Sequence, residues 1–138
     1  MHAKSTYTVK KWEEKPYEEI SPVMKMTKAS VQYEMSGDLT GKASVEYLMF
    51  YKHFDAKDQH KASAVYTGLM RFTGSVNGKA GSFVMEDSGA FEGGTAKSTL
   101  QIISGSGTEE LNGISGTGNY IANQNGFNLE LNYELHWM

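Results

Sequence analysis

The sequence predicts an all-β protein, an eight-stranded antiparallel up-and-down β-barrel, from three observations. Apolar and polar residues alternate with a period of two in many segments, turn-forming pairs such as Asn-Gly separate these segments, and long amphipathic helices are not evident. Closing the eight strands into a ring removes the sheet edges that invite aggregation. A β-sandwich is the alternative, because alternation and spacing do not distinguish two packed sheets from one closed sheet.

The chain of 138 residues suits a single barrel domain over residues 1–138. The segment 13–20, EEKPYEEI, is predicted to be a loop or at most a short helical turn, and the polar segment 53–62 to connect two strands. The predicted strands lie near residues 4–13, 27–36, 42–52, 63–76, 79–91, 95–103, 114–122 and 127–135.

The clearest strand signals lie at residues 28–35 and 127–135. In KASVQYEM and FNLELNYEL every second residue is apolar, and the residues between them are polar. Successive side chains of a strand point to opposite faces, so one face of each segment is expected to meet the core and the other face water.

The pair Asn77-Gly78 predicts a two-residue hairpin, because Asn and Gly tolerate the positive φ that such a turn requires. The register that follows pairs Val76 with Lys79, Gly74 with Gly81, Phe72 with Phe83 and Met70 with Met85. The face with the aromatic and methionine side chains is expected to be the interior. On the opposite face, Arg71 and Glu86 lie on a diagonal and are expected to form an exposed ion pair.

The glycine-rich stretch 104–120, SGSGTEELNGISGTGNY, does not fit a phosphate-binding loop. Glu110 stands where G-x-G-x-x-G requires its third glycine, and the sequence has no Gly-Lys-Ser/Thr. A further strand follows the stretch, where a phosphate loop would lead into a helix. We therefore expect these glycines to let the backbone turn sharply where the barrel closes.

Composition excludes several classes of function. Thirteen basic and sixteen acidic residues give a formal charge of −3, so no nucleic-acid partner is expected. Without cysteine the chain has no disulfide, no thiol nucleophile and no thiolate metal ligand. The N-terminal residues lack the apolar run of a signal peptide, and the longest apolar run, 47–51, is too short to span a bilayer. We expect a cytoplasmic protein with no membrane partner.

The lumen of the predicted barrel gathers tyrosines, and this clustering is the main functional signal. Buried phenol groups need hydrogen-bond partners, which a ligand can supply, and an eight-stranded barrel is wide enough to hold one small ligand. The sequence thus predicts a site for a small, partly apolar molecule. Its candidate residues are Tyr33, Tyr47, Met70, Phe72, Phe83, Met85, Tyr120 and Tyr133.

A solid barrel is the competing interpretation, in which the tyrosines fill the lumen and bond to one another. Such a barrel would act as a structural or interaction protein and form a homo-oligomer, most simply a dimer. Its contacts would come from outer apolar residues such as Ile103, Ile121 and Trp137.

Catalysis is a further alternative, ranked after binding, with Asp87 as the candidate catalytic residue. The hairpin register places Asp87 on the inner face, where partial burial would raise its pKa toward that of a proton carrier. The protein would then be an isomerase or cyclase acting on a small hydrophobic substrate. The plainer interpretation of Asp87 is a rim carboxylate that anchors a bend at Ser88-Gly89.

No metal site and no cofactor are predicted. His53, Asp55, Asp58 and His60 offer four ligating side chains within eight residues, but their spacing matches no motif of fixed geometry. A hydrolase with a G-x-S-x-G nucleophile is equally unsupported.

Four segments carry a resemblance to a known family: WEEKPYEEI at 12–20, VEYLMFY at 45–51, GSVNGKAGSFVMEDSGAFE at 74–92 and SGSGTEELNGISGTG at 104–118. Together they resemble the bacterial family catalogued as domain of unknown function 3224, which is similar in fold to allene oxide cyclase. The resemblance implies an eight-stranded antiparallel barrel with a central cavity, often in an oligomer. It implies no settled activity, and no catalytic residue of the cyclases can be matched to a position in this chain.

Overall fold

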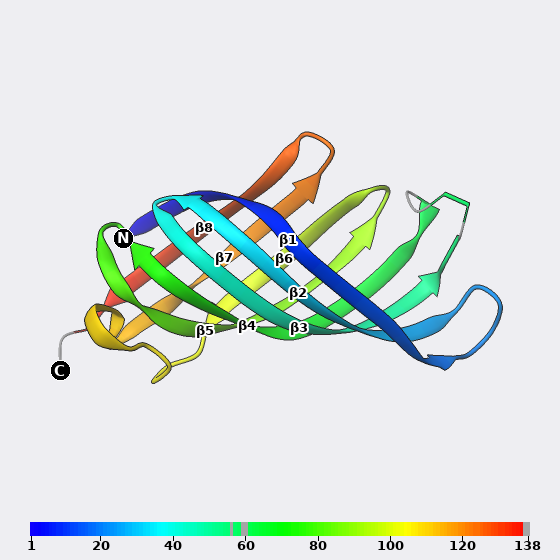
Figure 1. Cartoon of the computed structure of the whole chain (residues 1–138), viewed down its shortest axis with the longest axis horizontal. Helices are drawn as coiled ribbons and strands as arrows, with labels where there is room; N and C mark the ends of the chain where they lie inside the picture. The colour runs from blue at the N-terminus through cyan, green and yellow to red at the C-terminus, as the bar shows by residue number, and fades with distance from the viewer. Residues whose placement is uncertain (56, 59–60, 137–138) are drawn as a thin grey trace.

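The computed structural model describes residues 1–55, 57–58 and 61–136 of the chain. Each strand pairs antiparallel with the next, and β1 pairs with β8, so the sheet closes into a barrel (Figure 1). The predicted up-and-down barrel is confirmed, and the closed sheet leaves no place for a sandwich. The elements are β1 (His2–Glu19), β2 (Lys25–Gly37), β3 (Leu39–His53), β4 (Ser63–Val76), β5 (Lys79–Glu92), β6 (Thr95–Ile102), the 3-10 helix η2 (Glu109–Leu111), β7 (Ile114–Asn123) and β8 (Gly126–Leu135).

Strand β1 runs on to Glu19, so the prediction of a loop or helical turn at 13–20 was wrong. Its pairing with β2 shifts register between Val9 and Lys11 and again between Pro16 and Glu18. Such bulges let a strand continue past residues that do not fit the regular ladder, and proline, which has no amide hydrogen to donate, is tolerated at them.

The predicted faces and the predicted hairpin register are confirmed. In β2, Ala29, Val31, Tyr33 and Met35 are buried while Lys28, Gln32 and Glu34 are exposed. The β4–β5 hairpin pairs Val76 with Lys79 and Phe72 with Phe83, and its turn residues Asn77 and Gly78 have φ of 48° and 85°.

The predicted ion pair between Arg71 and Glu86 was wrong. Both side chains are exposed, and no ion pair joins them in the described part of the chain. Arg71 Nη2 instead donates a hydrogen bond to Ser82 Oγ at 3.3 Å. An exposed diagonal pair gains too little energy to hold two long side chains in one geometry.

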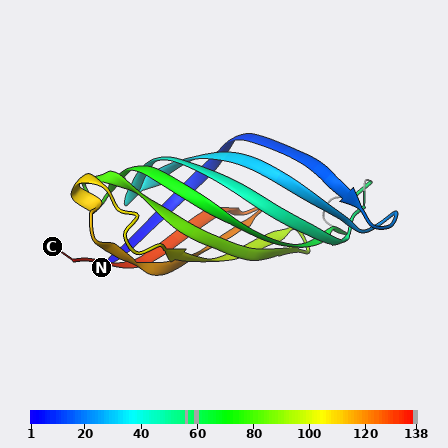
Figure 2. The same cartoon turned by 90° about the horizontal axis from the view of Figure 1, so that it is seen from below.

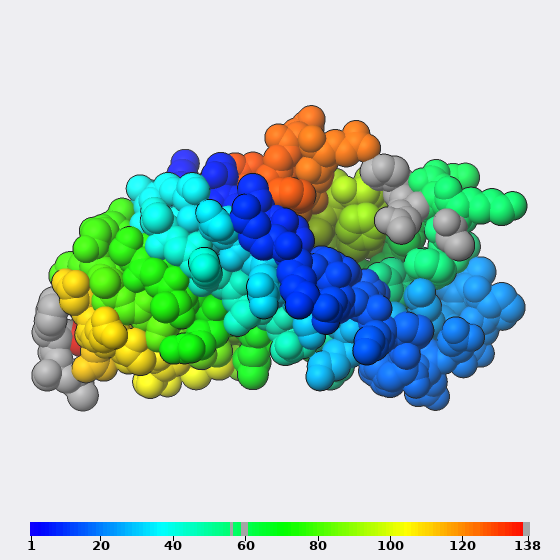
Figure 3. All heavy atoms as spheres, viewed as in Figure 1, coloured from blue at the N-terminus to red at the C-terminus, as the bar shows by residue number. Residues whose placement is uncertain are grey.

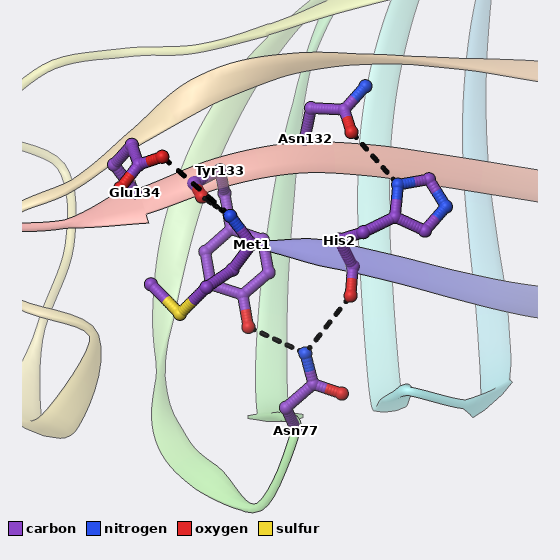
Figure 4. Close-up of polar contacts among 6 residues, drawn as sticks. All are labelled: Met1, His2, Asn77, Asn132, Tyr133 and Glu134. Carbon is purple, nitrogen blue, oxygen red and sulfur yellow. Dashed lines mark hydrogen bonds and ion pairs between the residues drawn. The ribbon is translucent and has the colours of Figure 1, made fainter.

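One end of the barrel is closed by contacts between distant parts of the chain (Figure 4). At the β4–β5 turn, Asn77 Nδ2 donates to the hydroxyl of Tyr133 at 2.6 Å and to the carbonyl of His2 at 3.3 Å. The amino group of Met1 donates to the carbonyl of Tyr133 at 2.8 Å. These contacts tie the tip of one hairpin to the seam where β1 meets β8.

The glycine-rich stretch closes the same end by packing along β5. Thr108 accepts from the amide of Ser82 at 3.0 Å through its hydroxyl, and Ser106 accepts from the amide of Val84 at 3.0 Å in the same way. A Cβ on Gly81 would come within 2.2 Å of the carbonyl oxygen of Thr108, so the approach requires glycine there. Leu111 of η2 is fully buried beneath this loop. Within the stretch Gly105, Gly113 and Gly116 have φ of 87°, 83° and 143°, so the expectation that these glycines let the backbone turn sharply is confirmed.

The opposite end of the barrel is open. The N-terminus, the end of β8 and η2 lie at the closed end, whereas the β1–β2, β3–β4, β5–β6 and β7–β8 connections lie at the other end (Figures 1 and 2). The strands β6 to β8 have 8 to 10 residues, against 13 to 18 in β1 to β5. The wall is therefore lower on the side of β6 to β8. In the space-filling view, β1 and the β7–β8 hairpin flank a recess at this end (Figure 3).

On the outer surface, Ile121 is exposed and Ile103 is half-buried, while Trp137 lies outside the described residues. The formation of a homo-oligomer through these residues stays a prediction.

Within the described residues, no helix has the length and apolar character needed to cross a membrane.

Candidate functional site

A cavity of about 800 Å³ occupies the open half of the barrel. Its wall is largely aromatic, and its floor is a layer of tyrosines midway along the barrel. The wall includes Tyr7, Trp12, Tyr51, Phe54, Phe91 and Phe127, and the floor consists of Tyr33, Tyr47, Tyr66 and Tyr120.

The structure divides the eight predicted ligand-binding residues into two groups. Tyr33, Tyr47 and Tyr120 line the cavity. The other five are buried but do not line it; they fill the closed half of the barrel, where the Phe72 and Phe83 ring centroids lie 5.4 Å apart. These five are Met70, Phe72, Phe83, Met85 and Tyr133. The barrel is thus packed in one half and hollow in the other.

Sequence reasoning missed Tyr7, Tyr66 and Trp12 as cavity residues. Alternation gave a usable signal for Tyr7 and Tyr66, because each stands two residues from an apolar residue, Val9 and Ala64 respectively. Trp12 gave no such signal. It follows the bulge between Val9 and Lys11, which moves the inward face from odd-numbered to even-numbered residues.

The floor tyrosines are joined by their hydroxyl groups. The Tyr47 oxygen lies 2.9 Å from the Tyr120 oxygen and 3.4 Å from the Tyr33 oxygen. Tyr120 donates to Tyr66 at 3.2 Å, and the Tyr66 oxygen lies 2.5 Å from Ser98 Oγ. The phenol groups therefore satisfy one another even when the cavity holds no ligand.

Asp87 lies directly behind this floor and is fully buried. Tyr47 donates to Asp87 Oδ2 at 2.6 Å, whereas Oδ1 has no hydrogen-bond partner among the described residues. Burial raises the Asp87 pKa to about 6, and hydrogen bonding from Tyr47, Ser98 and Tyr120 limits the rise. Because β5 continues to Glu92 without a bend at Ser88-Gly89, the interpretation of Asp87 as a rim carboxylate was wrong.

Two glycines make room for this network. Gly68 stands in register between Tyr47 on β3 and Asp87 on β5, and Gly89 stands likewise between Tyr66 on β4 and Ser98 on β6. In both rows the tyrosine hydroxyl reaches across the glycine to the polar group beyond it. A Cβ on Gly89 would lie 2.7 Å from the Tyr66 hydroxyl, so a larger residue would collide with the network.

Burial raises the pKa of Tyr33, Tyr47, Tyr66 and Tyr120 above the usual value for a phenol. These hydroxyls therefore stay protonated at neutral pH. They present neutral donors and acceptors to whatever lies above them in the cavity.

The mouth of the cavity carries two charged residues, Glu14 and Lys25. Glu14 is held by three donors: the hydroxyls of Thr27 and Tyr51, each at 2.7 Å, and Trp12 Nε1 at 3.0 Å. Lys25 Nζ lies 3.5 Å from the ring centroid of Phe54 and 5.4 Å from that of Tyr51.

The described residues contain no group of three or more His, Asp or Glu side chains placed to hold a metal ion. Of the four ligating residues of the 53–62 segment, His60 lies outside the described residues.

The fold and the cavity together define the class: an antiparallel β-barrel with an internal pocket open at one end. The family described as "Protein of unknown function (DUF3224)" matches residues 3–135, and the chain belongs to this family. A crystal structure of a DUF3224 protein of unknown function from Shewanella oneidensis MR-1 is similar in fold, with a TM-score of 0.76 and 18% sequence identity over 100% of this chain and 98% of that chain. No curated protein matches the chain.

Proposed function

We propose that the protein binds one small, partly apolar molecule in the open half of the barrel. The observation that carries the proposal is the cavity of about 800 Å³ with an aromatic wall and a hydroxyl floor. Ligand pockets typically measure roughly 300–1,000 Å³ and combine an apolar lining with a few polar groups that orient the ligand.

Binding is also supported by how the cavity is built. Phe127 stacks on Tyr7 with ring centroids 5.3 Å apart, and Tyr51 meets Phe54 edge-on at 5.5 Å, so the wall is held by its own ring contacts. The floor hydroxyls already have partners within the protein when no ligand is bound. A pocket that needs little rearrangement loses little free energy on binding.

Native mass spectrometry with a neutral probe, 1-decanol, tests binding. We expect one decanol per barrel, and we expect Ala122→Trp to reduce the adduct because Ala122 lines the cavity and an indole there would occupy part of it. Ala80→Trp, at an exposed position outside the cavity, is the matched control and should keep the adduct. An adduct of equal abundance in the Ala122→Trp variant would place the probe elsewhere and refute the proposal.

A second function, isomerase or cyclase, is favoured by one specific observation. The 2.6 Å contact between Tyr47 and Asp87 joins a cavity hydroxyl to a buried carboxyl whose pKa is about 6. As a proton leaves a carbon next to a substrate carbonyl, Tyr47 would accept it and pass its own phenolic proton to Asp87. The hydroxyl of Tyr33 would stabilise the enolate oxygen, and the reverse transfer would return a proton to carbon.

Deuterium exchange at the carbons beside the carbonyl of 2-decanone, followed by NMR in heavy water, tests this chemistry. We expect the protein to accelerate the exchange and Asp87→Asn to abolish the acceleration while the ketone still binds. Exchange at the buffer rate with the ketone bound would rule the activity out.

A further inference from the structure

We infer that the ligand of this cavity is a monoanionic amphiphile, bound with its anionic group at Lys25 and its apolar body directed toward the tyrosine floor. This inference rests on the proposed binding function and specifies its ligand class.

Lys25 is built into the mouth of the cavity. It is the first residue of β2 and has the same strand parity as Thr27 and Ala29, which are buried, so it points inward. Its ammonium group lies over the ring of Phe54, and its strand partners are Tyr51 on β3 and Glu19 on β1, with which it forms no ion pair in the described part of the chain. The side chain is therefore held at the rim, where its stem covers aromatic surface and its charge faces the opening.

The charge of Lys25 is not neutralised by the protein. No ion pair involving Lys25 occurs in the described part of the chain, and it is the sole cation among the described residues that line the cavity. Glu14, the other charged residue at the mouth, forms no ion pair with Lys25 among the described residues; its oxygens accept hydrogen bonds from three neutral donors. An anionic group of a ligand is thus the partner that Lys25 lacks.

The two ends of the cavity favour this orientation. The floor lies against the buried carboxyl of Asp87, which contacts Tyr47 and has no cation beside it among the described residues. An anion pushed to the floor would meet like charge and would lose its water. At the mouth it would keep part of its hydration and meet the ammonium group, while the apolar body replaces water along the aromatic wall.

A cationic amphiphile fits this mouth less well. Phe54 and Tyr51 form the aromatic surface at this part of the mouth, and the ammonium of Lys25 already lies there. A second cation would have to displace it. We therefore expect the affinity of the cavity for an amphiphile to depend on the charge of its head group as well as on the size of its apolar body.

Isothermal titration calorimetry with decanoate, 1-decanol and decyltrimethylammonium at about pH 7.5 tests the inference. Decanoate should bind the unmodified protein about tenfold more tightly than decanol, as expected for one charge-assisted contact at a partly hydrated site, and the cationic probe should bind most weakly. In Lys25→Gln the preference for decanoate over decanol should vanish. Lys25→Arg should retain the preference.

Lys28→Gln is the matched control, because Lys28 lies on the exposed face of the same strand. It should leave all three affinities unchanged. Equal binding of decanoate and decanol to the unmodified protein, or a preference that survives in Lys25→Gln, would overturn the inference and leave the binding function standing. If none of the three probes bound, both the inference and the binding function would fall.

Discussion

At the scale of single residues, Asp87 is a carboxyl group whose environment departs strongly from that of a free side chain. It is fully buried behind the floor, one of its oxygens has no partner among the described residues, and burial raises its pKa from 3.8 to about 6. The folded protein therefore holds a proton that the unfolded chain releases between these two pH values. Stability must fall as pH rises through this window.

The Asp87→Asn variant should remove this dependence. A difference of about two pKa units corresponds to about 3 kcal/mol, so the free energy of unfolding of the unmodified protein should fall by up to that amount, relative to the variant, between about pH 3.5 and 7.5. Urea unfolding of both proteins at a series of pH values measures this difference in unfolding free energy. Glu86→Gln, on the exposed face of the same strand, should leave the pH dependence intact. Parallel pH profiles for the unmodified protein and Asp87→Asn would contradict this account of Asp87.

Gly68 should tolerate no side chain. A Cβ there would lie 2.2 Å from the Glu46 carbonyl oxygen and 3.0 Å from a ring carbon of Tyr47, so Gly68→Ala must push β3 and Tyr47 aside. We expect a loss of about 1–3 kcal/mol in unfolding free energy, as for other overpacked interiors, with a shifted Tyr47 ring signal in NMR spectra. A variant as stable as the unmodified protein would show that the Tyr47–Gly68–Asp87 row is less tightly packed than described.

At the scale of elements, the β4–β5 turn at the closed end and the β7–β8 turn at the open end differ in their contacts. Asn77 adopts a positive φ and also bonds to Tyr133 and His2, whereas Asn125, in the β7–β8 turn, has neither feature. The β4–β5 turn at the closed end therefore helps to hold the barrel together, whereas Asn125 in the β7–β8 turn makes no contact of this kind in the described part of the chain.

Substitutions at the two turns should separate these roles. Asn77→Ala removes both the residue type that tolerates a positive φ and the two side-chain hydrogen bonds. It should lower the free energy of unfolding by about 2 kcal/mol. Asn77→Gly keeps the fit and should cost about half as much, and Asn125→Ala should cost less than about 0.5 kcal/mol. Thermal unfolding monitored by circular dichroism ranks the three variants. Equal losses for Asn77→Ala and Asn125→Ala would contradict the closed-end role of Asn77.

The strands could be predicted from the sequence where alternation is regular and could not where it is interrupted. Alternation placed Tyr33 and Tyr133 inward, and the Asn77-Gly78 pair gave the β4–β5 register. The bulge at Val9 and Lys11 reverses the inward face of β1, so Trp12 and Glu14 were not predicted at the mouth. The Tyr47–Gly68–Asp87 row depends on two strand pairings, β3 with β4 and β4 with β5. Only the β4–β5 pairing has a short turn from which its register could be predicted.

At the scale of the whole molecule, the barrel separates stability from binding along its axis. The closed half is filled by Met70, Phe72, Phe83 and Met85, all of which are almost inaccessible to solvent. The open half is a cavity with a half-exposed rim that includes Trp12 and Phe127. This division also explains why alternation alone could not locate the cavity: inward-facing residues fill one half of a strand and line a void in the other.

Truncations in the two halves should have opposite effects. Phe72→Ala should cost about 3–5 kcal/mol in unfolding free energy and leave decanol affinity unchanged in the folded fraction. Phe127→Ala should cost about 1 kcal/mol, since the ring is partly exposed and stacks on Tyr7, and should weaken decanol binding. Denaturant unfolding and calorimetry on both variants provide the test. A Phe127→Ala variant with unchanged decanol affinity would argue that the probe binds outside the cavity.

The most direct test of the central claim, that the open half of the barrel is a ligand site, is a crystal structure of the protein grown with decanoate. We expect one decanoate inside the barrel, between the tyrosine floor and the aromatic rim, with its carboxylate beside Lys25 and the Tyr47–Asp87 contact intact. A barrel whose rim side chains had folded inward to fill the space, with no decanoate among them, would contradict it.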